Sequence, residues 1–336
     1  MKAALLRTVG KIETNPLEIT EVEQPTAGIG QVLLRIDACG VCRSNLHMVE
    51  GDWLHLGVPT KFPMIPGHEI AGTIVEVGPG VESVRKNDRI GVQPLWTACG
   101  ACEYCLTGRE QLCPKREITG ESVDGGYAGY MVAYESHVYP LPSNVGPAAA
   151  APLFCPGITA YSAVRKAAME PGKKVAVFGI GGVGHMAIQF AKLCGAEVYA
   201  VTRGENHLAL SEELGATAVD GNDDPVGALK RIGGVDSSIV FAPSSKVAEQ
   251  AMKATKPGGT IVMGAWGGFP DFPFYDEKKV VGTLMGSRQA MKEVLQLAAS
   301  GKISAVTESF RLEDANHVLR MLKEGRIKAR AVLLPG

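Results

Sequence analysis

The sequence predicts a two-domain α/β protein, in which a mostly β domain is joined to a domain built on a doubly wound parallel sheet. The chain has 336 residues, which is long for one hydrophobic core and indicates about two domains. Residues 1 to about 150 contain short strand candidates broken by Gly and Pro, whereas strands and helices alternate from residue 157 onward. We therefore expect one domain from residues 1–156 and 285–336, and a second from residues 157–284.

The expected elements follow from apolar periodicity and turn signals. In the first domain, strands are expected at 32–36, 70–77 and 88–92, the second of which ends at the turn signal Gly78-Pro79-Gly80. In the second domain, strands are expected at 174–178, 197–201, 237–241 and 260–264, and helices at 183–194 and 206–214. Two further helices, at 289–300 and 313–324, are expected in the last segment.

Charge and hydropathy exclude several classes of function. The 34 basic and 35 acidic residues give a formal net charge of -1, and no long run of one sign occurs. This argues against nucleic acid or an anionic membrane as the main partner. No apolar stretch reaches the roughly 18 residues that a membrane span needs, and the N-terminus lacks the pattern of a secretory signal. We expect a cytoplasmic protein.

A glycine-rich loop joins the first strand and first helix of the second domain. It reads Gly179-Ile180-Gly181-Gly182-Val183-Gly184, with the spacing Gly-x-Gly-x-x-Gly. In this context Gly179 permits a tight turn, Gly181 lets the backbone approach a pyrophosphate, and Gly184 lets the helix pack close to the strand. The helix N-terminus then offers free N–H groups to the phosphates. A dinucleotide site is favoured over a glycine-rich turn without a ligand.

The end of the following strand bears on which dinucleotide binds. An acid at this place hydrogen-bonds the ribose 2′-hydroxyl of NAD. Here the place is held by Thr202 and followed by Arg203, so an acid is absent and a cation is present. The pattern favours NADP slightly. If Arg203 faces solvent and Thr202 binds a ribose hydroxyl, the site would suit NAD instead.

Four cysteines lie close together in the first domain. Cys99, Cys102, Cys105 and Cys113 have two, two and seven residues between them. Four thiolates from one short loop can surround a tetrahedral ion and leave no open position, which is typical of a structural zinc site. A redox role for the cysteine pairs is a weaker alternative.

Three further candidates are dispersed and gain meaning from their flanks. Cys42 lies in Cys39-Gly40-Val41-Cys42-Arg43-Ser44-Asn45-Leu46-His47, His68 lies in Pro66-Gly67-His68-Glu69, and Cys155 lies in Phe154-Cys155-Pro156-Gly157-Ile158-Thr159. With these segments, the four-cysteine lobe and the glycine-rich loop in this order, the chain resembles the zinc-containing medium-chain alcohol dehydrogenases over nearly its whole length. The resemblance implies a GroES-like catalytic domain and a Rossmann coenzyme domain.

The resemblance also implies roles for individual residues. Cys42, His68 and Cys155 would hold a catalytic zinc, the second zinc ion of the chain, and leave one position for water or a substrate oxygen. Glu69 matches an acid that can approach this zinc. Ser44 and His47 match the positions that pass the alcohol proton, through the cofactor ribose, to the surface. Arg43 would contact the cofactor pyrophosphate, and Thr159 would line the nicotinamide.

The chain departs from the family pattern at three positions, Asn45, Asn87 and Pro94. Asn45 stands where an Asp usually accepts a hydrogen bond from the zinc-binding His, so we expect a weaker, uncharged contact to His68. Asn87 replaces a turn Gly and should tolerate the left-handed conformation. Pro94 stands where many relatives have a pocket Trp, whereas Trp53 matches a frequent pocket aromatic. We expect a partly open, apolar pocket for medium or aromatic substrates.

The activity implied is hydride transfer between a primary or secondary alcohol, or an aldehyde, and NAD(P). One alternative is a zinc-free quinone or enone reductase of the same superfamily, which would not need Cys42, His68 and Cys155 together. A zinc-lobe protein that binds nucleic acid is disfavoured by the net charge. A relative that binds cofactor without turnover is disfavoured by the presence of Ser44 and His47. By family analogy, a homotetramer or homodimer is expected.

Overall fold

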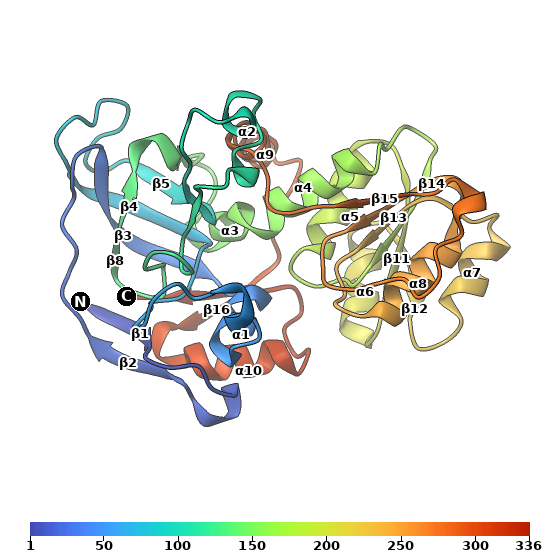
Figure 1. Cartoon of the computed structure of the whole chain (residues 1–336), viewed down its shortest axis with the longest axis horizontal. Coiled ribbons are helices and arrows are strands. Elements are labelled where there is room, and N and C mark those ends of the chain that lie inside the picture. The colour runs from blue at the N-terminus through green and yellow to red at the C-terminus, as the bar shows by residue number, and fades with distance from the viewer. The chain divides into compact units, whose positions relative to one another are not determined.

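The computed structural model describes all 336 residues, which divide into two compact units. Unit 1 contains Met1–Cys155, Ser287–Gly301 and Ala305–Gly336, and unit 2 contains Pro156–Gly286 and Lys302–Ser304. The two-domain α/β class predicted from the sequence is confirmed (Figure 1). None of the helices is long and apolar enough to cross a membrane.

Unit 1 is built on a seven-stranded sheet. Its strands are β3 (Gln31–Gly40), β4 (Ile70–Val77), β5 (Arg89–Val92), β8 (Tyr130–Tyr134), β9 (Val138–Pro140), β16 (Thr307–Arg311) and β17 (Arg330–Leu334). The order is β16-β17-β3-β4-β5-β9, and β8 also pairs with β3. The antiparallel pairing of β17 with β3 sets Val332 opposite Gly40, so the C-terminal strand lies beside the end of β3. This register positions a residue of the functional site.

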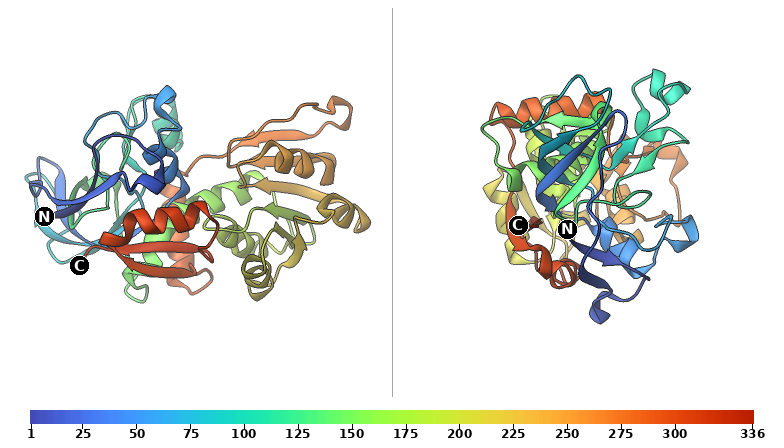
Figure 2. Two further views of the ribbon diagram at one scale, coloured as in Figure 1. Left: turned by 90° about the horizontal axis from the view of Figure 1, so that it is seen from below. Right: turned by 90° about the vertical axis from the view of Figure 1, so that its left-hand side faces the viewer.

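Two ribbons and several short helices complete unit 1. The ribbons are β1 (Lys2–Leu6) with β2 (Leu17–Glu21), and β6 (Leu95–Thr97) with β7 (Glu117–Ile118). The helices are α1 (Arg43–Glu50), α2 (Glu103–Leu106), α3 (Pro147–Ala150), α9 (Arg288–Ala299) and α10 (Ala315–Lys323), with 3-10 turns η1 (Ile12–Thr14), η2 (Leu54–Leu56), η3 (Glu110–Leu112), η4 (Glu135–His137), η5 (Ala151–Phe154) and η7 (Leu312–Asp314). Helix α10, red in Figure 2, lies alongside the strands of the C-terminal segment. It buries Ala315, Val318 and Leu319, which share one face by their spacing. That face joins the main core of unit 1.

Unit 2 is a six-stranded parallel sheet with helices on both faces. Its strands are β10 (Lys174–Phe178), β11 (Glu197–Thr202), β12 (Thr217–Asp220), β13 (Val235–Val240), β14 (Thr255–Met263) and β15 (Lys279–Gly282). Its helices are α4 (Pro156–Lys166), α5 (Gly184–Leu193), α6 (Glu205–Glu213), α7 (Pro225–Arg231) and α8 (Ser245–Ala254), with one 3-10 turn, η6 (Phe274–Asp276). Strand β10 is apolar because both of its faces are covered.

The strand order of unit 2 is that of a doubly wound sheet. It runs β12-β11-β10-β13-β14-β15, so the chain moves outward from β10 in one direction and then crosses to β13. Ligands of such sheets bind at the carboxyl ends of the strands where the order reverses. The glycine-rich loop begins directly after β10, at this point.

Every strand and helix expected from the sequence is present, with ends shifted by a few residues. For example, the helix expected at 313–324 begins as η7 and becomes α10 at Ala315. Among the elements that were not expected from the sequence are α1, β8 and β15. These are short elements, and their formation depends on tertiary pairing rather than on local periodicity.

The turn before β5 has the conformation expected of it. Asn87 has a φ of 75°, in the left-handed region, and its N–H donates to the Ile74 carbonyl at 2.8 Å. Asn tolerates this region better than other non-glycine residues. The turn therefore keeps β4 and β5 in register without glycine.

We predict that Asn87→Val destabilises the protein by about 1–2 kcal/mol, because a β-branched residue is strained at positive φ. Asn87→Gly should be neutral or slightly stabilising, since glycine adopts this conformation freely. Chemical denaturation of both variants checks the prediction. Equal stability of the two would show that the turn relaxes to another conformation.

Candidate active site

The three dispersed residues come together in unit 1. The ligand atoms of Cys42, His68 and Cys155, with one carboxylate oxygen of Glu69, all lie within 4.8 Å of one another, and all four residues are buried. Cys42 follows β3 as the N-cap of α1, and His68 precedes β4. Because Cys39 of β3 pairs with Ile70 of β4, the sheet brings these two segments side by side. Cys155 joins them from the junction of η5 and α4.

The geometry of this cluster fits a tetrahedral metal ion. The sulfur atoms of Cys42 and Cys155 are 3.8 Å apart. Zinc–sulfur bonds of about 2.3 Å in a tetrahedron give an edge of roughly 3.8 Å. The hydrogen bond between the two sulfur atoms lowers the pKa of Cys42 well below its usual value and, with burial, raises the pKa of Cys155. The pair is thus arranged to hold a thiolate, the form that binds metal.

The Glu69 carboxylate in this cluster is not free, because Arg330 binds it. Arg330 Nε donates to Glu69 Oε2 at 3.0 Å, and a second guanidinium nitrogen donates to Oε1. Their side chains are 4% and 0% exposed, respectively. Gly40 permits this placement, since a Cβ there would collide with the Glu69 carboxylate. Arg330, which no sequence motif pointed to, is therefore part of the site.

Ser44 and His47 lie on α1, beside the cluster. Ser44 Oγ is 3.4 Å from His68 Nε2. His47 Nδ1 is 2.7 Å from Asp52 Oδ2, and the ring of Trp53 stacks on His47 with centroids 5.5 Å apart. The predicted pocket aromatic and the predicted surface His are thus direct neighbours. His47 is one-quarter exposed, which gives a proton on its ring access to solvent.

The hydrogen bond expected between Asn45 and His68 is not made. Asn45 Oδ1 instead accepts from the backbone N–H of Cys42 at 3.3 Å and from the Tyr127 hydroxyl at 3.2 Å. Asn45 is the third residue of α1, where its oxygen satisfies the free N–H of the N-cap residue. His68 Nδ1 has no hydrogen-bond partner in the chain. The amide oxygen therefore supports the Cys42 backbone and not the imidazole.

Arg43 and Pro94 also have defined surroundings in unit 1. Arg43 donates to the Leu322 carbonyl of α10 at 3.1 Å and is half-buried. Pro94 is buried between β5 and β6, and its carbonyl accepts from the Thr119 N–H at 2.8 Å. Neither contact tests the roles that the resemblance implied.

The four-cysteine lobe also has the spacing of a metal site. Cys105 Sγ lies 3.9 Å from Cys99 Sγ and 3.6 Å from Cys102 Sγ, and the Cys99 N–H donates to Cys113 Sγ at 3.5 Å. All four sulfur atoms lie within 4.8 Å of one another. Backbone N–H groups of Ala101 and Cys102 lower the pKa of Cys99 to about 6, which favours its thiolate. The lobe therefore suits a closed, four-thiolate metal site.

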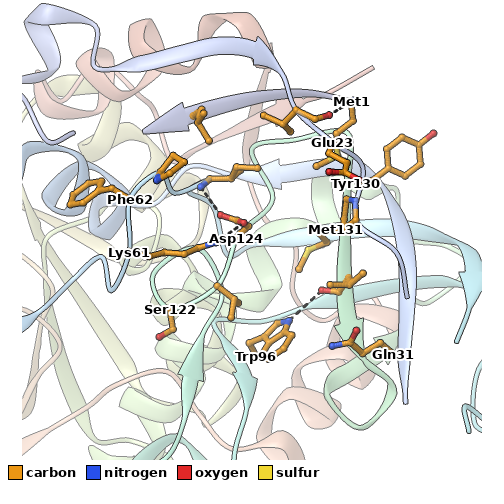
Figure 3. A pocket seen from close by; sticks show the side chains of 18 residues that line it. Met1, Glu23, Gln31, Lys61, Phe62, Trp96, Ser122, Asp124, Tyr130 and Met131 are labelled. Atoms are coloured by element: carbon orange, nitrogen blue, oxygen red, sulfur yellow. Dashed lines mark hydrogen bonds and ion pairs between the residues drawn. The ribbon is translucent and has the colours of Figure 1, made fainter. Parts of the chain in front are cut away.

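A cavity of about 650 Å³ lies elsewhere in unit 1. Its walls come from the 61–65 segment, the 122–125 loop, β8 and the start of the chain (Figure 3). Asp124 binds Lys61 at 2.8 Å and accepts from the Ile65 N–H at 3.0 Å, so the loop is tied to the segment that leads to His68. Cys42, His68 and Cys155 do not line this cavity.

The glycine-rich loop of unit 2 has the conformation that a dinucleotide site needs. Gly179 has a φ of 94°, and a Cβ at Gly184 would collide with the Gly179 carbonyl, so the first turn of α5 packs close to β10. A Cβ at Gly181 would meet open space. Gly182 and Val183 complete the loop, and Val183 is the N-cap of α5. Backbone N–H groups at this helix end can bind phosphate.

The other cofactor candidates lie on neighbouring elements of unit 2. Thr202 ends β11 and is buried, and Arg203 follows it, exposed, before α6. The Gly179 N–H donates to the Val201 carbonyl at 2.9 Å, which places the end of β11 beside the glycine-rich loop. Thr159 is half-buried on α4.

Comparison with known proteins agrees with both units. Residues 28–143 match the alcohol dehydrogenase GroES-like domain, and residues 182–300 match the zinc-binding dehydrogenase family. An alcohol dehydrogenase of Geobacillus stearothermophilus is 42% identical over 344 residues, which cover 99% of this chain and 98% of that protein. The chain belongs to the zinc-dependent medium-chain alcohol dehydrogenases.

Solved structures agree with this assignment. The crystal structure of the alcohol dehydrogenase from Aeropyrum pernix has a TM-score of 0.93 and 35% identity, with 100% of both chains covered. A structure described as an NAD-dependent alcohol dehydrogenase has a TM-score of 0.92 and 30% identity, also with 100% of both chains covered. The protein is an alcohol dehydrogenase that uses zinc and a nicotinamide cofactor. The zinc-free reductase alternative has no support.

We predict that Arg330→Met lowers the free energy of unfolding by about 3–5 kcal/mol, because it leaves the Glu69 carboxylate buried without its partner. Arg311→Met is the control, since Arg311 forms an exposed pair with Asp314 and should cost at most about 1 kcal/mol. Denaturant titration measures both. A cost for Arg330→Met no greater than that of the control would contradict the assignment of this pair as a structural element of the site.

Proposed function

We propose that this alcohol dehydrogenase binds two zinc ions per chain and that Cys42, His68 and Cys155 hold the catalytic one. The observation that supports this most is the meeting of these three ligand atoms within 4.8 Å, with the two sulfur atoms at a tetrahedral edge. Cys99, Cys102, Cys105 and Cys113 would hold the structural ion. The two sets differ in ligand number, since three protein ligands leave one position open and four do not.

The residues around the cluster would each have a separate task in the reaction. Zinc bound there supplies a Lewis acid for the substrate oxygen, and the nicotinamide gives or takes the hydride. Arg330 would compensate the negative charge of Glu69 beside the proposed zinc ligands. Burial of the cluster excludes water and strengthens the interactions of its charges.

Ser44 and His47 are proposed as the proton-transfer residues. Ser44 Oγ, 3.4 Å from His68 Nε2, lies where it can accept the proton of the substrate hydroxyl. His47 would carry this proton to solvent, because its ring is partly exposed and its Nδ1 is oriented by Asp52. Trp53 stacks on the same ring and, with Pro94, would form an apolar wall for medium or aromatic primary alcohols and aldehydes.

The cofactor is proposed to bind unit 2, with residues 157–284 as the coenzyme domain. The pyrophosphate would be bound by the glycine-rich loop, with Gly179, Gly181, Gly182, Val183 and Gly184. Further contacts to the cofactor would come from Arg43 and Thr159. NADP is favoured because Thr202 and Arg203 stand where NAD-binding chains have an acid. The exposure of Arg203 leaves its guanidinium accessible to a 2′-phosphate.

Assembly and location are further proposals. The 264–284 segment and edge strand β15 carry large exposed apolar residues, with Phe274 80%, Tyr275 76% and Trp266 64% exposed. Exposed apolar residues concentrated at a sheet edge support a homodimer or homotetramer. None of the eight cysteines forms a disulfide, which supports a reducing, cytoplasmic location.

We predict that metal analysis finds two zinc ions per chain. Cys155→Ser should retain about one and lose turnover, whereas Cys105→Ser should lose the other and lower the Tm, because a four-thiolate site stabilises a lobe with little core. Cys194→Ser, an exposed cysteine outside both clusters, is the control and should retain both ions. Two ions retained in Cys105→Ser would contradict the structural-zinc proposal.

We predict that benzaldehyde reduction by zinc-replete enzyme has a higher kcat/KM with NADPH than with NADH. Arg203→Ala should lower the NADPH value by roughly tenfold, the usual worth of a charge-assisted hydrogen bond, and leave the NADH value nearly unchanged. Arg231→Ala, an exposed cation on α7, is the control. Preference for NADH, unaffected by Arg203→Ala, would assign NAD instead. No turnover with either cofactor would reopen the substrate class.

A further inference from the structure

A loop between β7 and β8 packs directly on the backbone that presents His68. A Cβ at Gly120 would lie only 2.7 Å from the Gly67 nitrogen, so the two glycines are in backbone contact. Nearby, the Gly125 N–H donates to the Ile65 carbonyl at 2.7 Å, and the Gly126 N–H donates to the Gly67 carbonyl at 2.9 Å. Residue 121 of this loop is therefore close to the ligand cluster.

The backbone of Glu121 is fixed by hydrogen bonds on both sides. Its N–H donates to the Ile118 carbonyl at 3.1 Å, and its carbonyl accepts from the Thr60 N–H at 3.0 Å. The Gly120 N–H donates to the Val123 carbonyl at 2.8 Å and closes the turn. The backbone that carries the Glu121 side chain is therefore in place before any ligand binds.

The side chain of Glu121 differs in its surroundings from those of the residues that follow it. Ser122, Val123 and Asp124 line the 650 Å³ cavity, where Figure 3 shows Ser122 and Asp124, and Glu121 does not line it. The half-buried Glu121 carboxylate makes no side-chain hydrogen bond or ion pair, and the charges of His68, Cys42 and, to a lesser extent, Arg116 act on it. Burial raises the pKa of Glu121, and the charge of His68 opposes this.

Glu121 is a separate acid beside the ligand cluster and is not one of its candidate ligands. Glu121 is not a member of the group whose ligand atoms all lie within 4.8 Å of one another. The other acid of the cluster, Glu69, is compensated by Arg330. Glu121 therefore presents an acceptor without a partner beside the position where the alcohol is oxidised.

We propose that Glu121 determines substrate specificity by binding a second polar group of the alcohol, a hydroxyl or an ammonium. This inference rests on the proposed catalytic role of Cys42, His68 and Cys155. A half-buried carboxylate without a partner is unfavourable, and a donor on the substrate satisfies it. Diols and amino alcohols, with the second group a few carbons from the reacting one, are then preferred over alkyl alcohols of equal length.

The experiment compares three alcohols of equal heavy-atom count: pentan-1-ol, butane-1,4-diol and 4-aminobutan-1-ol. The kcat/KM of each is measured for the wild-type holoenzyme, Glu121→Leu and Glu121→Gln. Glu117→Gln is the matched control, since Glu117 is a half-buried acid four residues away on β7. The Tm of each variant shows whether the fold is retained.

In the wild type, the diol, the amino alcohol or both should be preferred over pentan-1-ol. Glu121→Leu should reduce this preference by roughly tenfold or more, the range expected when a hydrogen bond to a charged group is lost, and its Tm should be unchanged or higher. Glu121→Gln should retain activity with the diol and lose the preference for the amino alcohol, which distinguishes hydroxyl recognition from ammonium recognition.

If the kcat/KM ratios of the diol and the amino alcohol to pentan-1-ol in Glu121→Leu stay within about twofold of the wild type, the assignment of Glu121 is overturned. Turnover of pentan-1-ol in the same experiment would leave the proposed function standing. Absence of turnover with all three alcohols by zinc-replete wild type would overturn the proposed function, and this inference with it. The same change of ratios in Glu117→Gln would attribute the effect to loop charge in general, and would also overturn the assignment.

Discussion

The buried ion pair between Glu69 and Arg330 is the contact that the ligand cluster depends on most. It joins the start of β4 to β17, a strand from the far end of the chain, across the end of β3. The Gly40 N–H donates to the Glu69 carbonyl at 2.8 Å, and the Val41 N–H donates to the Ala331 carbonyl at 2.9 Å, so all three strands are bonded within a few residues of Cys42 and His68. A charged pair removed from water needs such fixed geometry, because desolvation of both groups otherwise outweighs their attraction.

The two cysteine clusters show how similar ligand chemistry serves different tasks. In the lobe, four sulfurs come from one segment with little apolar core, so the ion itself would provide the stability. In the catalytic cluster, the ligands come from three segments that the sheet and η5 already hold in place, and the surroundings are fully buried. By this proposal, the first set would close around an ion, and the second would leave one position for substrate.

Several polar groups lie close to the ligand cluster. Asn45, Tyr127 and the Cys42 backbone form a neutral hydrogen-bonded group under α1, and Glu121 lies on the turn that packs against Gly67. These residues lie close to the sequence motifs around Cys42 and His68. Each of them, however, gets its role from a partner that is distant in the sequence. Specificity in this enzyme is therefore to be sought in the 119–125 loop as much as in the stacked pair of His47 and Trp53.

The sequence by itself determined the fold class, the glycine-rich loop and the spacing of the six cysteines and one histidine proposed as metal ligands. It could do so because glycine turns, apolar periodicity and cysteine spacing are local signals. It also determined that Asn87 could replace a turn glycine, since backbone preference belongs to the single residue. Only the tertiary structure decided that Arg330 meets Glu69 and that Asn45 bonds Tyr127 instead of His68. Arg330 and Glu69 are 261 residues apart, and Tyr127 and Asn45 are 82 residues apart, so these contacts are fixed by strand register and helix capping that no local pattern encodes.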